Sequence, residues 1–347
     1  MYWIGEADMK RSRLLERLRL SSERTTNALA SRGLLPPYGK ALHHPVFAVF
    51  PPQAASADGL DIDYLGLRTQ KEMLPSYWRS SGDACDATVP LHPAFDEEYF
   101  EWIDVLESAD EAARAGAADY TMIELGAGYA RWSARAWAAA QRLGLSARLG
   151  VVEAEPQHMV WARSHLAFNG VPDSDAVFFE SAVGTEKGET VFLVEMPEGS
   201  VGNSAQDWYG QAVTWADPAK AVTTQRTYLG HELVAMPGGW NGVRVKVNRL
   251  SDILKAFGRI DLVDFDVQGA ELDTVREALA PLTSQVRRLH IGTHSREIDA
   301  GLPSLLGGAG WRCVRAYQCL RWNRTEFGWI SFVDGVQTWV NPALAPG

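Results

Sequence analysis

Two glycines separated by one residue, Gly126 and Gly128, follow an apolar run that ends in Glu124 and a leucine. An apolar run, a glycine turn and a helix-rich segment in this order predict a buried strand, a tight turn and a helix. In open parallel sheets such a turn lies at the carboxyl end of a strand, where glycine lets a ligand approach the main chain closely. We therefore expect Glu124, Gly126, Ala127 and Gly128 to contact a nucleotide-like cofactor. Arg131 stands where a dinucleotide fingerprint has its third glycine or alanine, so the turn alone leaves the cofactor open.

A second acidic position follows at the end of the next predicted strand, in the segment V-V-E-A-E-P at 151–156. In a doubly wound fold, the acidic residue that ends this strand accepts hydrogen bonds from the hydroxyls of a ribose. Glu155 directly precedes a proline that suits the first turn of a helix, so it is our first choice, and Glu153 is the second. The alternative is that one of the two only starts the helix and stabilises its dipole.

The ends of the third and fourth predicted strands supply further candidates. At the third, small residues leave room for a flat heterocycle, and we assign Glu180, Ser181 and Ala182 to the cofactor site. The fourth ends in D-F-D-V-Q-G-A-E-L at 264–272, where Asp266 is expected to line the site and to act in catalysis.

A histidine just beyond the fifth predicted strand, His294, is a candidate general base or metal ligand. His290 lies within that strand, where a histidine is more often packed. A magnesium ion held by Asp266 with His294 or Glu271 would suit the residue types. Nothing in the spacing requires an ion, and we assign no metal ligand. Glu271 also fits a plain electrostatic role in the first turn of a helix.

Strands alternate with helices along most of the chain, which predicts a doubly wound, mostly parallel, Rossmann-like α/β sheet with helices on both faces. We expect a seven-stranded sheet, and three further β-like runs near the end of the chain predict that its C-terminal edge is antiparallel. The strands are expected at 121–125, 148–152, 176–179, 260–265 and 286–291, and the later runs are at 312–317, 329–333 and 336–340.

Two regions break this rhythm. Residues 1–94 read as an N-terminal extension of helical and irregular structure, whose basic helix at 10–31 is a candidate surface for a homodimer. The stretch at about 197–242 shows no clear period, and we interpret it as an insertion on the substrate side of the main domain at 95–347. Its aromatic residues could stack on a sugar or serve only in packing; they are Trp208, Tyr209, Trp215 and Trp240.

The composition of the chain limits which binding partners and which cellular compartment we expect. A net charge of −10, with 46% hydrophobic and 22% charged residues, is typical of a soluble globular protein. The negative charge argues against a general affinity for nucleic acid or for anionic membranes. The three cysteines form no C-x-x-C pair, no signal peptide is evident, and no apolar run approaches the ~20 residues of a membrane span. We expect a cytoplasmic protein.

Taken together, the E-L-G-A-G turn, the acid–proline step and the D-V-Q-G-A-E-L segment resemble the FkbM-type family of class I S-adenosylmethionine-dependent methyltransferases. The resemblance runs from about 121 to 310. It implies a class I methyltransferase domain that binds S-adenosylmethionine and methylates a hydroxyl of a small molecule, such as a sugar or a polyketide-type metabolite of secondary metabolism. The chain departs from the family where Glu124 replaces an aspartate and Tyr129 follows the turn.

Two other classes stay open on the sequence alone. An NAD(P)-dependent oxidoreductase would share the glycine turn and the ribose acid, and a non-catalytic nucleotide-binding protein would keep the same fold.

Overall fold

The computed structural model of the chain describes residues 43–54, 59–74, 92–197 and 216–344. The basic helix expected at 10–31, and with it the candidate dimer surface, lies outside these ranges. So do Trp208, Tyr209 and Trp215 of the predicted insertion. Within the described ranges, no helix is long and apolar enough to cross a membrane.

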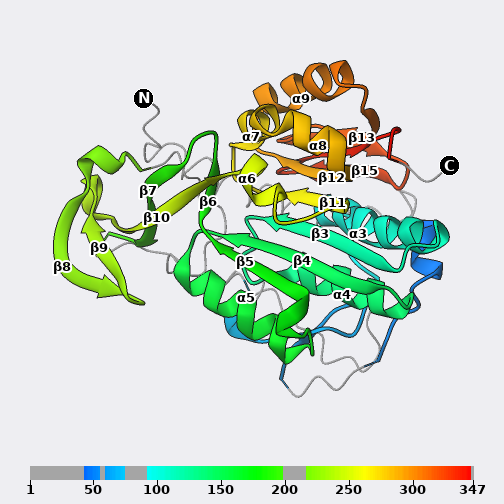
Figure 1. Cartoon of the computed structure of the whole chain (residues 1–347), viewed down its shortest axis with the longest axis horizontal. Coiled ribbons are helices and arrows are strands. Elements are labelled where there is room, and N and C mark those ends of the chain that lie inside the picture. Colours follow the sequence, from blue (N-terminus) through cyan, green and yellow to red (C-terminus); the bar gives the residue numbers. More distant parts are fainter. Residues whose placement is uncertain (1–42, 55–58, 75–91, 198–215, 345–347) are drawn as a thin grey trace, which may run out of the picture.

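A seven-stranded sheet forms the centre of the molecule, in the order β13-β16-β12-β11-β3-β4-β5 (Figure 1). The run from β5 to β12 is parallel, and β16 is antiparallel to both of its neighbours. This confirms the predicted mostly parallel, doubly wound sheet. The antiparallel strand, however, lies one position in from the edge, because β16 enters between β12 and β13. The strands are β3 (Asp119–Leu125), β4 (Ser146–Glu153), β5 (Ala176–Glu180), β11 (Ile260–Phe265), β12 (Val286–Thr293), β13 (Arg312–Tyr317) and β16 (Gly335–Val340).

Helices cover both faces of this sheet, and each face has its own apolar core. One core joins the sheet to α3 (Glu97–Arg114), α4 (Arg131–Arg142) and α5 (Pro156–Phe168). The other joins it to α6 (Leu250–Leu254), α7 (Glu271–Glu277), α8 (Leu279–Gln285) and α9 (Arg296–Gly308). The central strands are buried on both sides, which explains their continuous apolar runs.

A second, five-stranded sheet lies beside the first (Figure 1). It consists of β6 (Ala182–Gly184), β7 (Gly188–Glu195), β8 (Val222–Tyr228), β9 (His231–Ala235) and β10 (Asn241–Arg249). The described part of the predicted insertion is therefore not irregular: it contains β8 and β9, which form a hairpin that pairs with β10. The sequence predicts no strand there because most of β8 is exposed and polar.

The described N-terminal segments pack onto the first core. Phe47, Phe50 and Tyr64 are buried in the same cluster as the apolar face of α3. A small C-terminal hairpin, β14–β15, also contributes Ile330 and Phe332 to it. The domain boundary at 94 stays a prediction. The remaining elements are η2 (Pro45–Ala48), β1 (Asp61–Ile62), β2 (Arg68–Thr69), η3 (Lys71–Met73), η4 (Asp173–Asp175), η6 (Pro218–Lys220), η7 (Pro237–Gly239), β14 (Arg321–Thr325) and β15 (Gly328–Phe332).

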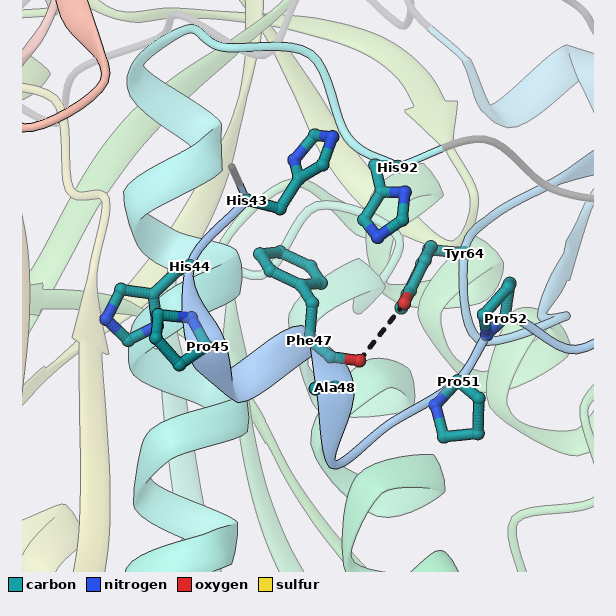
Figure 2. Close-up of a pocket in the computed structure, with 9 residues that line it drawn as sticks. All are labelled: His43, His44, Pro45, Phe47, Ala48, Pro51, Pro52, Tyr64 and His92. Atoms are coloured by element: carbon teal, nitrogen blue, oxygen red, sulfur yellow. Dashed lines mark hydrogen bonds between the residues drawn. The ribbon is translucent and has the colours of Figure 1, made fainter. Parts of the chain in front are cut away.

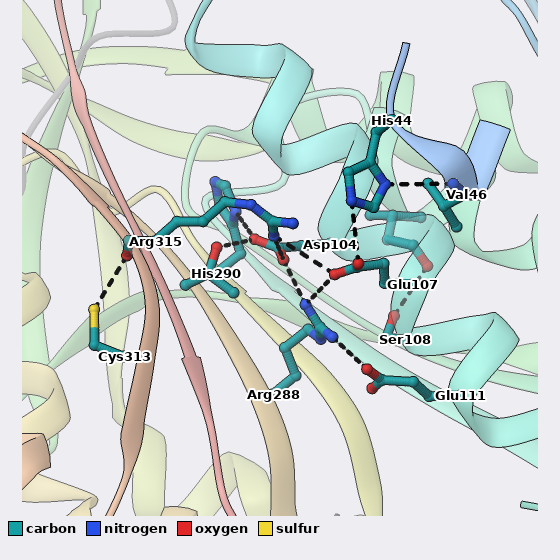
Figure 3. Close-up of polar contacts among 12 residues, drawn as sticks. His44, Val46, Asp104, Glu107, Ser108, Glu111, Arg288, His290, Cys313 and Arg315 are labelled. Carbon is teal, nitrogen blue, oxygen red and sulfur yellow. Dashed lines mark hydrogen bonds and ion pairs between the residues drawn. The ribbon is translucent and has the colours of Figure 1, made fainter. Parts of the chain in front are cut away.

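A buried carboxylate on α3, that of Asp104, connects this helix to three strands (Figure 3). It accepts hydrogen bonds from Arg288 of β12 at 2.7 Å, from Arg315 of β13 at 3.3 Å and from Thr338 of β16 at 2.5 Å. His290 Nδ1 lies 2.7 Å from the second oxygen. Burial alone would raise the pKa of Asp104, but its bond to His290 and the arginine charges outweigh burial and hold this pKa well below its usual range.

We predict that Asp104→Ala lowers the free energy of unfolding by about 3–5 kcal/mol, because it leaves two buried arginines without their shared carboxylate. The matched control is Asp110→Ala on the same helix, which removes only an ion pair with the largely exposed Arg114. That change should cost less than about 1 kcal/mol. Urea denaturation measures both, and equal losses would show that Asp104 does not hold the helix to the sheet.

Candidate functional site

The glycine turn lies where the carboxyl ends of three strands meet. The N–H groups of Gly126 and Ala127 both donate to the carbonyl oxygen of Val152, at 3.0 Å each. Gly126 has a φ of +80°, and a Cβ built on it would lie 1.9 Å from the carbonyl oxygen of Asp266. The turn of β3 is thus packed between the ends of β4 and β11, and only glycine fits at its first position.

Glu153, the last residue of β4, fixes this turn in place. One carboxylate oxygen accepts the N–H of Gly128 at 2.7 Å, and the other accepts those of Ala154 and Glu155, also at 2.7 Å. The side chain is buried. The sequence ranks Glu153 second as a ribose ligand, whereas its carboxylate here faces main-chain donors and orients the residue ranked first.

Glu155 follows at the end of β4 and is fully buried. One oxygen accepts the N–H of His158 at 2.6 Å and caps α5, which confirms the helix-start role considered from the sequence. The other accepts the hydroxyl of Tyr228 at 2.9 Å. A carboxylate has about four lone-pair sites, so these two bonds leave it acceptor capacity for a further hydroxyl.

Tyr228 is the residue of this site that sequence reasoning missed. It comes from β8 of the second sheet, seventy-three positions along the chain from Glu155. No period marks β8 as a strand, and no local spacing links it to the glycine turn. Only the hairpin with β9 places its hydroxyl at the carboxylate.

Glu124, predicted to contact the cofactor, turns toward α4 instead. Its carboxylate accepts the N–H groups of Trp132 at 3.2 Å and Ser133 at 2.8 Å, and the hydroxyl of Ser133 at 2.5 Å. Burial, and next the charge of Asp264, raise the pKa of Glu124 to about 8. The structure therefore gives Glu124 a role in starting the helix, and a direct cofactor contact stays a prediction.

The three residues predicted at the end of β5 separate in the structure. Glu180 is exposed, and its carboxylate forms an ion pair with Arg163 at 2.8 Å. Ser181 is buried: its N–H donates to the carbonyl oxygen of Glu153 at 2.9 Å, and its hydroxyl accepts from Asn248 at 2.9 Å. Ala182 begins β6 of the second sheet. Ser181 is therefore bonded to the end of β4, and Glu180 pairs with Glu153 in the ladder between β4 and β5 although its side chain is exposed.

Asp266 and His294 are neighbours, as their positions at strand ends predict. Nε2 of His294 lies 3.3 Å from the Asp266 carboxylate, and Nδ1 lies 2.8 Å from that of Glu271. Burial would lower the pKa of His294, but the charge of Asp334 and the bonds to Asp266 and Glu271 outweigh it and hold this pKa well above the usual value.

This geometry changes the chemistry expected of the pair. An imidazolium bonded to carboxylates through both nitrogens has no lone pair for a metal ion and accepts no further proton. The general-base and metal-ligand roles considered for His294 do not follow from this arrangement, which favours a positioning role. The Asp266 side chain is half exposed, so its carboxylate is accessible from solvent.

A pocket of about 320 Å³ lies elsewhere, between the N-terminal segment and the loop before α3 (Figure 2). His43, Phe47, Tyr64 and His92 line it together with several prolines, and the rings of His43 and His92 stack at 3.9 Å. None of the residues predicted for the cofactor site lines this pocket. It borders on residues 42 and 91, which the structure does not describe, so we assign it no function.

No protein-family model matches the chain. A protein of Jannaschia sp. (strain CCS1), named provisionally as a methyltransferase, is 26% identical over 292 residues, which is 84% of this chain and 95% of that protein. Similar solved structures include the methyltransferase FkbM of Methylobacillus flagellatus KT, with 12% identity, 71% of this chain and 55% of that chain covered, and a TM-score of 0.36. Magnesium protoporphyrin IX methyltransferase of Synechocystis PCC 6803 has 11% identity, 71% and 82% coverage, and a TM-score of 0.35. Structural scores this low carry no argument about function.

We predict that Gly126→Ala lowers the free energy of unfolding by about 2–5 kcal/mol, because it adds a clash with main chain to the cost of a left-handed conformation. Gly144→Ala is the control: its φ is +73°, but a Cβ there meets nothing within 4 Å. The control should cost about 1–2 kcal/mol. Thermal unfolding of both variants measures the difference, and indistinguishable losses would contradict the close packing of the turn against Asp266.

Proposed function

We propose that this chain is a methyltransferase that uses S-adenosylmethionine and transfers its methyl group to a hydroxyl of a small molecule. The observation that carries the proposal is the glycine turn held by Glu153 beside the buried carboxylate of Glu155. Gly126 and Gly128 have no side chains of their own that could block a ligand, and the Glu155 carboxylate has acceptor capacity for ribose hydroxyls. S-adenosylmethionine, when bound, supplies a methyl group on an electrophilic sulfonium. The name of the 26% identical relative supports the same reaction type.

A nicotinamide cofactor fits this turn less well. The third glycine of the dinucleotide fingerprint allows a helix and a strand to pack closely. Here Arg131 occupies that position, and its guanidinium forms a two-point ion pair with Glu98 of α3, at 2.9 and 3.1 Å. The first residue of α4 is therefore an arginine bonded to α3, at the position where the nicotinamide-binding fold needs a glycine.

The chain's own contribution to methyl transfer is to orient the acceptor and to remove its proton. Asp266 lies at the end of β11, directly against Gly126, and its half-exposed carboxylate can accept a proton from a hydroxyl. The His294 imidazolium beside it fixes the orientation of that carboxylate. We assign Asp266 as the proton acceptor and His294 as its positioning residue.

We propose that the chain is related to the FkbM-type family, and the class of methyl acceptor follows from this resemblance. That resemblance favours a hydroxyl on a sugar or a polyketide-type metabolite, and thus a role in secondary metabolism. Trp240 is the described member of the aromatic residues that we considered for stacking, and it is only partly buried. The net charge of −10 favours a small molecule over a nucleic acid as the acceptor.

Calorimetry tests the cofactor. We predict that S-adenosylhomocysteine binds the purified chain, that NADPH does not, and that Glu155→Gln weakens binding at least ~10-fold, since hydrogen bonds to a charged group contribute about 1.5–3 kcal/mol. Glu186→Gln, an exposed change, is the control and should leave the affinity unaltered. Binding of NADPH without binding of S-adenosylhomocysteine would overturn the proposed function.

The role of Asp266 is tested by labelled methyl transfer to a panel of glycosides, macrolides and RNA. Asp266→Asn should lower the transfer rate at least ~100-fold, the scale of a positioned proton acceptor, while S-adenosylhomocysteine still binds. Asp273→Asn, which affects only an exposed pair with Arg276, should transfer at the native rate. A nearly native rate for Asp266→Asn would assign proton removal to another residue, and methylation of RNA alone would contradict the small-molecule acceptor.

A further inference from the structure

A row of polar side chains crosses the middle of the large sheet on the face that α3 covers. In the parallel ladder, Asp264 of β11 lies between Glu124 of β3 and His290 of β12. Asp264 and His290 are buried. Protein interiors rarely contain such a row unless opposite charges or hydrogen bonds stabilise it, because each charged group loses its hydration on burial.

Three of the side chains at this point form a compact group. A carboxylate oxygen of Glu101, one of Asp264 and a ring nitrogen of His290 all lie within 4.8 Å of one another. Glu101 is in the second turn of α3 and is partly exposed as a residue. The set combines two carboxylates with one imidazole, and such donors suit divalent ions such as Zn²⁺.

Asp264 supplies the observation that points to a ligand. Its Oδ1 has no hydrogen-bond partner among the residues that the structure describes, although the side chain is only 1% exposed. An unpaired carboxylate oxygen in the interior is costly, and the carboxylate of Glu101 beside it adds repulsion. Burial raises the pKa of both acids; the charge of Asp264 adds to this effect at Glu101, while the charge of Arg131 opposes it at Glu101 and that of His290 opposes it at Asp264.

The arginines nearby are already engaged elsewhere. Arg288 is bonded to Asp104, Glu107 and Glu111 (Figure 3). Arg131 is bonded to Glu98. Neither makes a hydrogen bond or ion pair with Asp264 in the part of the chain that the structure describes.

His290 is oriented as metal-binding histidines are. Its Nδ1 lies 2.7 Å from the carboxylate of Asp104, which leaves Nε2 as the nitrogen that can face the two acids. A histidine that binds a metal through one nitrogen typically donates the other N–H to a carboxylate, which fixes the tautomer and the ring. Asp104 is itself held by Arg288, Arg315 and Thr338, so the ring has a rigid support.

We propose that Glu101, Asp264 and His290 bind a divalent first-row transition-metal ion, with Zn²⁺ or Mn²⁺ as the chemistry that fits best. The ion compensates the two facing carboxylates and satisfies the orphaned oxygen of Asp264. Three protein ligands leave at least one coordination position for a further ligand, as in other three-ligand metal sites.

The position of this site suggests what the ion serves. Asp264 lies on β11, and Asp266 follows it by two residues, just past the end of that strand; the charge of Asp266 contributes to the raised pKa of Asp264. A divalent ion there supplies Lewis acidity next to the residue that we assign to proton removal. This role in methyl transfer rests on the proposed function, whereas binding of the ion does not.

Metal binding is measured directly on the full chain. After treatment with a chelator and dialysis against Zn²⁺ or Mn²⁺, mass spectrometry of the metal content should find about one ion per chain. Titration of the stripped protein should give an affinity that falls at least ~10-fold in Glu101→Gln and in Asp264→Asn, since the loss of an outer-shell partner alone costs about 10–100-fold. Glu101 is partly exposed, so its variant tests the ligand without emptying the core.

Asp266→Asn is the matched control, because it removes a carboxylate from the neighbouring group around His294. It should retain the ion. Loss of the ion in Asp266→Asn with retention in Glu101→Gln would place the site around His294 and overturn the proposal, as would the absence of stoichiometric binding of either metal. Titration of S-adenosylhomocysteine into the same variants tests the proposed function separately from the metal site. Loss of metal with retained cofactor binding contradicts only the metal site, and loss of cofactor binding with retained metal contradicts only the proposed function.

Discussion

Three short hydrogen bonds to the carboxylate of Glu153 determine the geometry of the candidate cofactor site. They join the glycine turn after β3 to the end of β4, and they orient the main chain at Glu155. Because the Glu153 side chain is buried and Gly126 leaves no space for a Cβ, the turn and Glu155 form one rigid unit. Tyr228 then links that unit to the second sheet.

Helix α3 relates the stability of the fold to its chemistry. Its middle is attached to the sheet through Asp104, and its first turns contribute Glu98 and Glu101 near the ends of β3 and β11. The contacts of Asp104 with the arginines support the fold, and its contact with His290 orients a ring in the proposed metal site. The Asp104 carboxylate thus both stabilises the fold and orients His290, and we expect its removal to weaken both the fold and the proposed metal site.

The sequence predicts those parts of the structure that local patterns determine. The strand at 260–265 and the run at 312–317 coincide with β11 and β13, because each is a short run with apolar and β-branched residues bounded by turn or helix signals. The glycine turn and Glu155 lie together as expected. The pattern cannot show which way a carboxylate points: Glu124, predicted to contact the cofactor, has a carboxylate that caps α4. Nor can it pair Asp104 with His290, which is 186 positions away, or find Tyr228 in a polar, exposed strand.

We propose that the glycine turn and Glu155 hold the methyl donor, and a crystal structure of the chain grown with S-adenosylhomocysteine tests this proposal. We expect electron density for the ligand against Gly126–Gly128, with both ribose hydroxyls within hydrogen-bond distance of the Glu155 carboxylate. Ligand density at another place in the fold, with Glu155 bonded only to His158 and Tyr228, would contradict it.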